Sequence, residues 1–333
     1  MAGAETGWGM GHWIGFNAAL VALLVLDLGI LTRKDHVVSM KEAALSTLMW
    51  TAIAGGMGVW FFMAVNADKG AAYLTAYVVE RALSVDNLFV FLVIFGYFQV
   101  PKQYQIRALF WGIIGALFAR AVFIAAGISV INAFAPVLFA LGAFLVYTAY
   151  KLAFAGAHEV DPEKNLALRL ARKLFPVSSI YDGHNFFTLQ NGIKTATPML
   201  LVVIVLGTTD LIFAVDSIPT VLGITRDGFV VWTSNAMAVL GMRPLYFLLA
   251  GMLQLFRFLQ YGLAIILGFV GAKMIFNEAV HQFGLNLHID HALETYGSLG
   301  FVMLVLISSI LLSRVIAPRP ARPSPEMAGG HPR

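Results

Sequence analysis

The sequence predicts an all-α protein that crosses the membrane several times, and its composition carries this prediction. Of the 333 residues, 59% are hydrophobic and only 12% are charged, which is about half the charged share of an ordinary soluble domain. The apolar residues form long runs rather than the short alternating segments of a membrane barrel. A soluble domain of this length could not bury so much apolar surface in one core. The composition excludes a cytoplasmic enzyme and a disordered chain, and the absence of cysteine excludes a disulfide scaffold.

Nine apolar runs are long enough to cross a membrane, which takes about 20 mostly apolar residues. The expected spans are residues 13–32, 43–65, 71–98, 108–131, 134–154, 198–223, 229–252, 258–277 and 296–316. No basic segment precedes the first run and no small-residue cleavage pattern follows it. We therefore expect this run to remain as a span rather than to be removed as a signal peptide.

The distribution of lysine and arginine tests the number of spans, because cytoplasmic loops carry an excess of both residues. With nine spans and the N-terminus outside, fifteen of these residues fall on the cytoplasmic side, and only Lys69 and Arg226 fall outside. One span more or fewer would destroy this asymmetry. The sequence therefore predicts nine transmembrane helices, N-out and C-in, in a bacterial inner membrane.

An internal repeat is the most informative feature of the sequence. Glu80 and Asp86 lie six residues apart in the third span, and Asp210 and Asp216 have the same spacing in the sixth. A valine precedes the second acid of each pair, and a small polar residue follows it, Asn87 in one case. The similarity continues downstream in the pairs Arg120 and Arg243, and Lys151 and Lys273.

Each copy of the repeat contains three spans, so the second copy enters the membrane from the opposite side. The sequence thus predicts a core of two inverted three-helix repeats, a recurring plan of secondary transporters whose site lies between the halves. The expected segments are residues 1–70 with two peripheral helices, 71–154 with the first repeat, 155–197 as a cytoplasmic loop, 198–278 with the second repeat, 279–316 with an outer loop and the last helix, and 317–333 as a disordered tail.

The cytoplasmic loop has two local patterns. Leu166, Leu170 and Leu174 form one helical stripe among basic residues, which predicts an amphipathic helix suited to the lipid surface. The pair Asn191 and Gly192 stands between two short β-prone runs and predicts a tight hairpin.

The four repeated acids are expensive to place in a membrane, because an aspartate at a helix centre costs about 2.5–3.5 kcal/mol. They must share protons, arginines or a metal ion. Two acids six residues apart point about 120° away from each other on a regular helix. We therefore expect a distortion near Ser84 in the third span and near Pro219 in the sixth if both acids of a pair reach one point.

Oxygen ligands without cysteine or deep histidine suit hard divalent cations such as Mg²⁺, Ca²⁺ or Mn²⁺. The candidate ligands are Glu80, Asp86, Asn87, Asp210 and Asp216, with Arg120 and Arg243 as counter-ions that balance or gate the site. In the alternative interpretation, the acids only pair with these arginines and lock the helix bundle. Asp27, near the cytoplasmic end of the first span, is either a ligand at the entrance or an interfacial acid.

The outer segment at residues 278–294 holds several acids and histidines, and we interpret it as a solvated loop rather than a metal site. No nucleotide-binding or nucleophile motif is recognisable, so neither an enzyme nor a nucleic-acid partner is expected.

These motifs resemble those of a known family. Residues 80–91, 209–220 and 233–249, together with Asp27 and the hairpin leading into 196–198, are similar to the signature stretches of the TerC family, with the bacterial Alx-type branch the most similar. The resemblance covers residues 13–316 and implies export of manganese from the cytoplasm, with a historical association to tellurite resistance. It also implies that Glu80, Asp86, Asp210 and Asp216, with Asn87 beside them, bind the metal.

The sequence therefore favours an exporter of divalent cations, with Mn²⁺ first, driven by exchange for protons. The partners expected are the metal ion and the lipid bilayer, and no resident cofactor is expected. One alternative is a non-transporting membrane scaffold that assists tellurite resistance or the metalation or insertion of other proteins. A weaker alternative is an intramembrane hydrolase with two catalytic aspartates.

Overall fold

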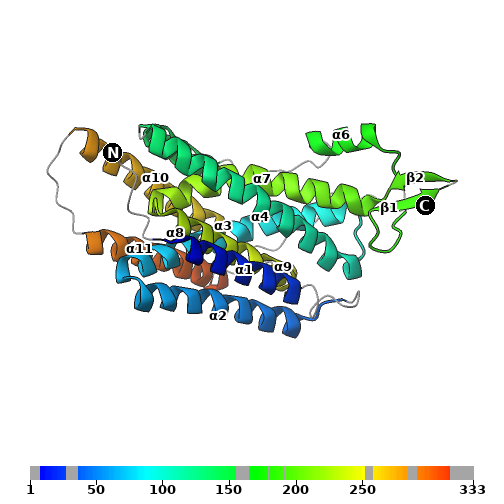
Figure 1. The fold of residues 1–333 in the computed structure, drawn as a ribbon, viewed down its shortest axis with the longest axis horizontal. Coiled ribbons are helices and arrows are strands. Elements are labelled where there is room, and N and C mark those ends of the chain that lie inside the picture. The colour runs from blue at the N-terminus through cyan, green and yellow to red at the C-terminus, as the bar shows by residue number, and fades with distance from the viewer. Residues whose placement is uncertain are drawn as a thin grey trace, which may run out of the picture.

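The fold was obtained as a computed structural model, which describes residues 8–27, 37–134, 136–154, 165–178, 180–190, 192–251, 258–283 and 291–315. Its elements in chain order are α1 (Met10–Leu26), α2 (Met40–Ala64), α3 (Ala67–Tyr97), α4 (Lys102–Ala133), α5 (Val137–Phe154), α6 (Leu166–Leu174), β1 (Phe187–Gln190), β2 (Ile193–Ala196), α7 (Pro198–Ile224), α8 (Gly228–Leu240), α9 (Met242–Ala250), α10 (Leu259–Gln282) and α11 (His291–Val315). The long helices form one bundle, and the β1–β2 hairpin projects from one end of it (Figure 1).

The described part of the chain is an all-α polytopic membrane protein, as the composition predicts. Six helices are long and apolar enough to cross a membrane, namely α2, α4, α5, α7, α10 and α11. The helices α1 and α8 are apolar but shorter, and α3 is long but carries Glu80, Arg81 and Asp86. The count of nine spans stays a prediction.

Polar residues at the helix starts explain why these helices begin where they do. The first backbone N–H groups of a helix have no partner within the helix, and a side-chain oxygen before it can accept from them. Ser39 accepts from the N–H of Glu42 at the start of α2, and Asn66 accepts from Lys69 at the start of α3. Asp227 accepts from two N–H groups at the start of α8, at 3.0 and 3.2 Å.

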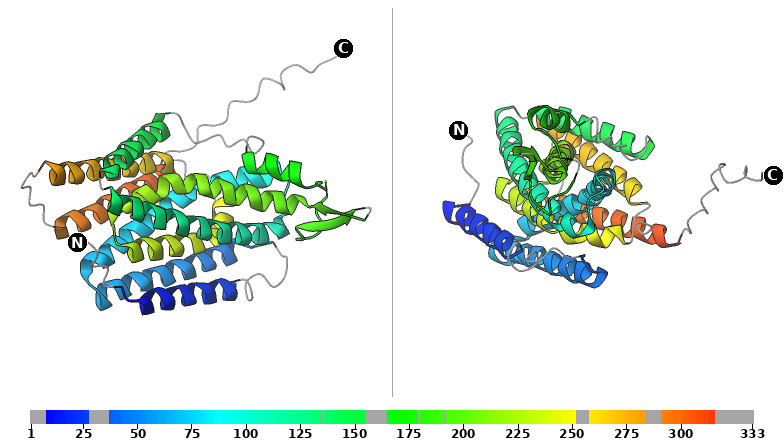
Figure 2. Two further views of the ribbon diagram at one scale, coloured as in Figure 1. Left: turned by 45° about the horizontal axis from the view of Figure 1, so that its top comes forward. Right: turned by 90° about the vertical axis from the view of Figure 1, so that its right-hand side faces the viewer.

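Pairs of helices from the two halves form the centre of the bundle. The helix α3 packs on α8, α4 packs on α7, and α5 packs closely on α10. The two further views show α1 and α2 on one side of this bundle (Figure 2). The acids of α3 and α7 therefore lie on helices that other helices surround.

The helix α1 contacts the α8–α9 segment through polar side chains at three levels. These contacts are Trp8 Nε1 to both carboxylate oxygens of Asp227 at 2.9 and 2.8 Å, Trp232 Nε1 to Asn17 Oδ1 at 3.3 Å, and the ion pair of Arg243 with Asp27. Only Phe16 and Leu20 are buried within α1. These polar contacts and the aromatic packing of Trp8, Trp13 and Phe16 on Phe229 together fix α1 along α8 and α9.

The helix break lies at a different place from the one expected. The expected span 229–252 is divided at Gly241 into α8 and α9, whereas α3 and α7 each continue as one helix past Ser84 and Pro219. Two residues explain the break. Pro244 has no N–H to donate to the carbonyl oxygen of Leu240, the last residue of α8, and Nη1 of Arg81 donates to the carbonyl oxygen of Ala238 at 3.0 Å. A Cβ atom at Gly241 would collide with the same guanidinium group. A cation near the last carbonyl groups of a helix is favourable, so Arg81 stabilises the end of α8.

The loop between α5 and α7, for which the sequence predicts a cytoplasmic position, contains a helix and a hairpin. Asn165 caps α6 by accepting from two N–H groups and also donates to Thr208 of α7 at 2.9 Å. Leu168 and Ala171 are buried against the bundle, whereas the stripe formed by Leu166, Leu170 and Leu174 is exposed. The strands β1 and β2 pair antiparallel, and Gly192 has the positive φ of 80° that such a turn requires. The tail at 317–333 lies outside the described residues.

Candidate functional site

A fully buried arginine joins acids from both halves of the chain. Glu80 of α3, Arg120 of α4 and Asp210 of α7 are 0%, 0% and 1% exposed. Nη1 of Arg120 donates to Oε1 of Glu80. On another edge of the guanidinium group, Nε and Nη2 donate to the two carboxylate oxygens of Asp210 at 3.1 and 3.3 Å. This two-pronged geometry makes a guanidinium–carboxylate pair both strong and directional.

Two neutral side chains complete the surroundings of Nη1. Ser217 Oγ lies 3.4 Å from this nitrogen, and Asn235 Oδ1 lies 3.3 Å from it. Ser217 comes from α7 and Asn235 from α8, and both are buried. Four helices therefore meet at one guanidinium group.

Several polar atoms at this cluster have no hydrogen-bond partner among the described side chains and backbone groups. They are Glu80 Oε2, Asn235 Nδ2 and, one helical turn from Glu80 on α3, Ser84 Oγ, and all three residues are 0% exposed. A buried polar atom without a partner costs about 1–3 kcal/mol, and such groups are usually satisfied by an internal water or an ion. The site is therefore incomplete with the side chains alone and can accept a small polar ligand.

The formal charges of this region include a second arginine. Arg81, next to Glu80 on α3, donates to the carbonyl oxygen of Ala238, which lies one helical turn from Asn235 on α8. The two acids and the two guanidinium groups are formally balanced, so the capacity of the cluster for a further cation rests on its unsatisfied oxygens.

The remaining predicted ligands lie one or two helical turns further along the same helices. Asn87 is 5% exposed, and Asp216 is half-buried on α7. Asp86 lies in α3, but its side chain is outside the part that the structure describes. Among the described side chains, no group of three or more His, Asp or Glu residues lies close enough together to hold a metal ion.

The two arginines of the repeat have different partners, although the sequence assigns both to the acids. Arg243 begins α9 and forms an ion pair with Asp27 at the end of α1, with the two side chains 7% and 8% exposed. This arrangement corrects the expectation that Arg243 serves the Glu80–Asp210 cluster. The physical reason is that Asp27, from outside the repeat, supplies the carboxylate that this buried guanidinium needs.

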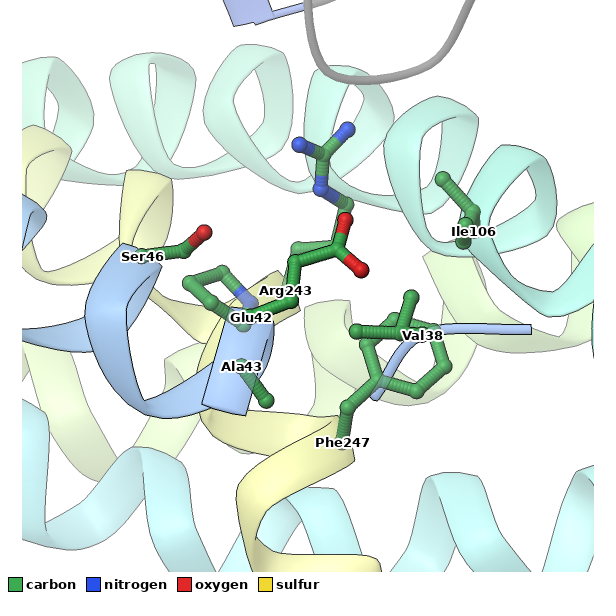
Figure 3. Close-up of a pocket in the computed structure, with 8 residues that line it drawn as sticks. Val38, Glu42, Ala43, Ser46, Ile106, Arg243 and Phe247 are labelled. Atoms are coloured by element: carbon green, nitrogen blue, oxygen red, sulfur yellow. The ribbon is translucent and has the colours of Figure 1, made fainter. Parts of the chain in front are cut away.

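A small cavity adjoins this second ion pair. Arg243 from α9 and Glu42 and Ser46 from α2 face it (Figure 3), and its volume is about 20 Å³. Nη1 of Arg243 is buried without a hydrogen-bond partner. A cavity of this volume holds about one water molecule, so a water can satisfy Nη1 there. Asp27 is thus part of a polar network between α1, α2 and α9.

The outer segment is described only in part. Glu278 is 3% exposed and pairs with Arg226 at 3.4 Å. Residues 284–290 lie outside the described part, as do the side chains of His281, His291 and Glu294.

Sequence reasoning found the charged residues of the cluster but not the neutral ones. Asn235, Ser217 and Ser84 are missing from the predicted ligands. A signal existed for Asn235, because the run from Thr233 to Asn235 places three polar residues inside an apolar span.

The fold and the buried acid–arginine cluster define a multi-pass α-helical membrane protein with an ionised interior. A family comparison identifies this class further: the chain belongs to the integral membrane protein TerC family, whose model matches residues 65–321.

Similar proteins come from several bacteria. An uncharacterized membrane protein of Myxococcus xanthus, STKORF319, is 44% identical over 79% of this chain and 83% of its own length. Alx of Salmonella typhi, named as a candidate membrane-bound redox modulator, is 39% identical over 81% of this chain and 86% of its own. Alx of Escherichia coli K12 is 38% identical over 81% and 87%. No solved structure matches this chain.

Proposed function

We propose that this protein is a secondary transporter that exports divalent cations, Mn²⁺ first, from the cytoplasm across a bacterial inner membrane in exchange for protons. The observation that carries the proposal is the meeting of buried Glu80 and Asp210, one from each half, with polar atoms left unsatisfied. A purely structural ion pair does not need the unsatisfied atoms.

The packing of the helices supports the inverted repeat that this mechanism uses. If residues 71–154 and 198–278 are related by a two-fold axis in the membrane plane, α3 must contact α8 as α7 contacts α4. The chain shows both of these contacts, and the third helices of the two units, α5 and α10, pack on each other. Nine spans, N-out and C-in, accompany this proposal.

In the proposed cycle the cation binds from the cytoplasm to deprotonated carboxylates of Glu80, Asp86, Asp210 and Asp216, with Asn87 as a neutral ligand. The halves then rock, and protons from outside displace the cation. Metal and protons compete for the same oxygens, so the coupling follows from shared ligands. No covalent bond of a substrate changes, so the protein is not an enzyme in this proposal.

Flux of Mn²⁺ into or out of proteoliposomes under an imposed pH gradient tests the proposal. We expect gradient-dependent flux in the wild type, with Mg²⁺ and Ca²⁺ as competitors to rank the metals. We expect at least a tenfold loss in Asp210→Asn and Asp216→Asn while both proteins remain monodisperse. Asp68→Asn is the matched control, because Asp68 is an exposed acid at the start of α3.

Undiminished flux in both Asn variants would overturn the carboxylate site, whereas no flux in folded wild type would overturn the transporter proposal. The second outcome would favour the non-transporting scaffold, for which the exposed leucine stripe of α6 is the supporting observation. The relatives named as redox modulators fit either case. Because this chain has no cysteine, it cannot carry out thiol–disulfide exchange with its own side chains.

A further inference from the structure

The surroundings of one nitrogen atom, Nη1 of Arg120, resemble a cation site more than an ordinary arginine pocket. The oxygen atoms around it are Glu80 Oε1, Ser217 Oγ at 3.4 Å and Asn235 Oδ1 at 3.3 Å. They come from α3, α7 and α8, hence from both halves of the chain. Carboxylate, hydroxyl and amide oxygens are the donors that hard divalent cations prefer.

The same place has spare ligand capacity. Oε2 of Glu80 and Oγ of Ser84, one helical turn away on α3, are buried and without a hydrogen-bond partner. Arginine binds oxygens only through its N–H groups, and these reach Oε1 of Glu80 but not Oε2 of Glu80 or Oγ of Ser84. Both of these oxygens therefore stay unsatisfied. A metal ion takes six or more oxygens at about 2.0–2.6 Å and would use more of them.

We infer that Nη1 of Arg120 marks the position of the transported cation, that Arg120 is its resident competitor, and that Asn235 and Ser217 are ligands. This inference rests on the proposed function. When the cation binds, the guanidinium group must leave the oxygens of Glu80, because one set of lone pairs cannot serve both cations. When the cation leaves, Arg120 returns and neutralises the acids.

The inference differs from a counter-ion role in what a charge-preserving variant does. Removing any nearby positive charge raises the affinity for a cation through the Coulomb interaction, so Arg120→Gln alone does not separate the two roles. Arg120→Lys keeps the charge, so it raises the affinity only if the planar guanidinium group of Arg120 competes for the same oxygens. The repeat supplies the matched control, since Arg243 occupies the equivalent sequence position but pairs with Asp27.

The experiment is a titration of the full chain, purified in detergent, with Mn²⁺ and detection of free Mn²⁺ by electron paramagnetic resonance. We expect Arg120→Gln to bind Mn²⁺ at least tenfold more tightly than the wild type and to release it more slowly. We expect Asn235→Ala to bind at least tenfold more weakly. Ser234→Ala is its control, because the hydroxyl of this equally buried neighbour bonds to its own helix at Val231.

Arg243→Gln and Ser234→Ala should stay within twofold of the wild type. If Arg120→Gln does not fold, Arg120→Lys keeps the positive charge without the planar fork, and we expect it to bind at least threefold more tightly than the wild type. Wild-type binding and flux with unchanged affinities in the Arg120 and Asn235 variants would overturn this inference alone. Absence of Mn²⁺ binding and flux in the folded wild type would overturn the proposed function and this inference together.

Discussion

The contact between α5 and α10 gives a sharp stability prediction, because two glycines let the backbones approach closely. A Cβ atom on Gly142 would lie 2.7 Å from Cγ1 of Ile275 and 2.9 Å from the backbone oxygen of Gly271. The optimal distance between two carbon atoms in contact is about 3.5–4.0 Å. An extra gap of about 0.5–1 Å loses a quarter to a half of the van der Waals attraction of each contact. In Gly142→Ala the helices must therefore separate along their closest interface, since a backbone oxygen cannot swing away.

Overpacking of this kind costs about 1–3 kcal/mol, whereas alanine gains about 0.8–1 kcal/mol over glycine in helix propensity. Gly268→Ala separates the two effects, because its new Cβ meets only Ala149, at an ordinary 3.6 Å. Both variants gain propensity, but only Gly142→Ala is overpacked. Their difference should therefore be about 1–3 kcal/mol.

Thermal unfolding in detergent, followed by tryptophan fluorescence, measures this difference. With about 2.1 cal/mol/K of unfolding entropy per residue, a change of 1 kcal/mol shifts Tm by about 1.4 °C in a chain of 333 residues. Gly142→Ala should therefore unfold at least about 1.4 °C below Gly268→Ala. Equal Tm values for the two variants would refute the reasoning, because they would show that α5 and α10 can move apart without any loss of stability.

Two further predictions concern α1 and the loop between α5 and α7. Asp27→Asn leaves Arg243 as a buried charge without its carboxylate, so we expect the free energy of unfolding to fall by about 3–5 kcal/mol, measured by thermal unfolding. The double variant Asp27→Arg with Arg243→Asp should recover part of this loss. If it recovers none, the two side chains do not form a direct ion pair. Tyr181 donates to the carbonyl oxygen of Phe98 at 2.8 Å, and burial raises its pKa to about 12 from 10.0. Because the folded state favours the neutral phenol, the stability that Tyr181 contributes is complete below pH 10 and is lost as the pH rises towards 12. Tyr181→Phe should remove this fall of Tm at alkaline pH, and also the phenolate absorbance that Tyr181 gives near pH 12. An unchanged dependence of Tm on alkaline pH in this variant would contradict the prediction.

Sequence reasoning identified the class of fold because membrane burial imposes a strong requirement on composition. It missed the break at Gly241, although Pro244 three residues later was a signal for it. The contribution of Arg81 could not be foreseen, because Arg81 reaches Ala238 from a helix far away in the sequence. In the same way Pro219 suggested a distortion, yet α7 continues through it, as happens when neighbouring helices support the freed backbone groups.

The candidate site shows the same division between charged and neutral residues. Glu80 and Asp210 were recognisable because a charge inside a membrane is rare and expensive. Ser217 and Asn235 were not, because small polar side chains occur in membrane helices for several reasons, including bonds to their own backbone. Only the position of Arg120 shows that these two residues belong to the cluster.

The different partners of the two repeat arginines follow from what each can reach. Sequence similarity between the units predicts equal roles, but a buried guanidinium group needs a carboxylate and takes one that its surroundings supply. Arg120 lies between acids of both units, whereas Arg243 meets Asp27 of α1, which has no counterpart in the repeat. A helix outside the repeat thus supplies the second arginine with its own acid, so Glu80 and Asp210 share one guanidinium group rather than two. A third guanidinium group on these acids, besides Arg120 and the nearby Arg81, would give the cluster a surplus of positive charge and would disfavour a further cation. The capacity of the cluster to bind a cation therefore depends on α1 as well as on the repeat.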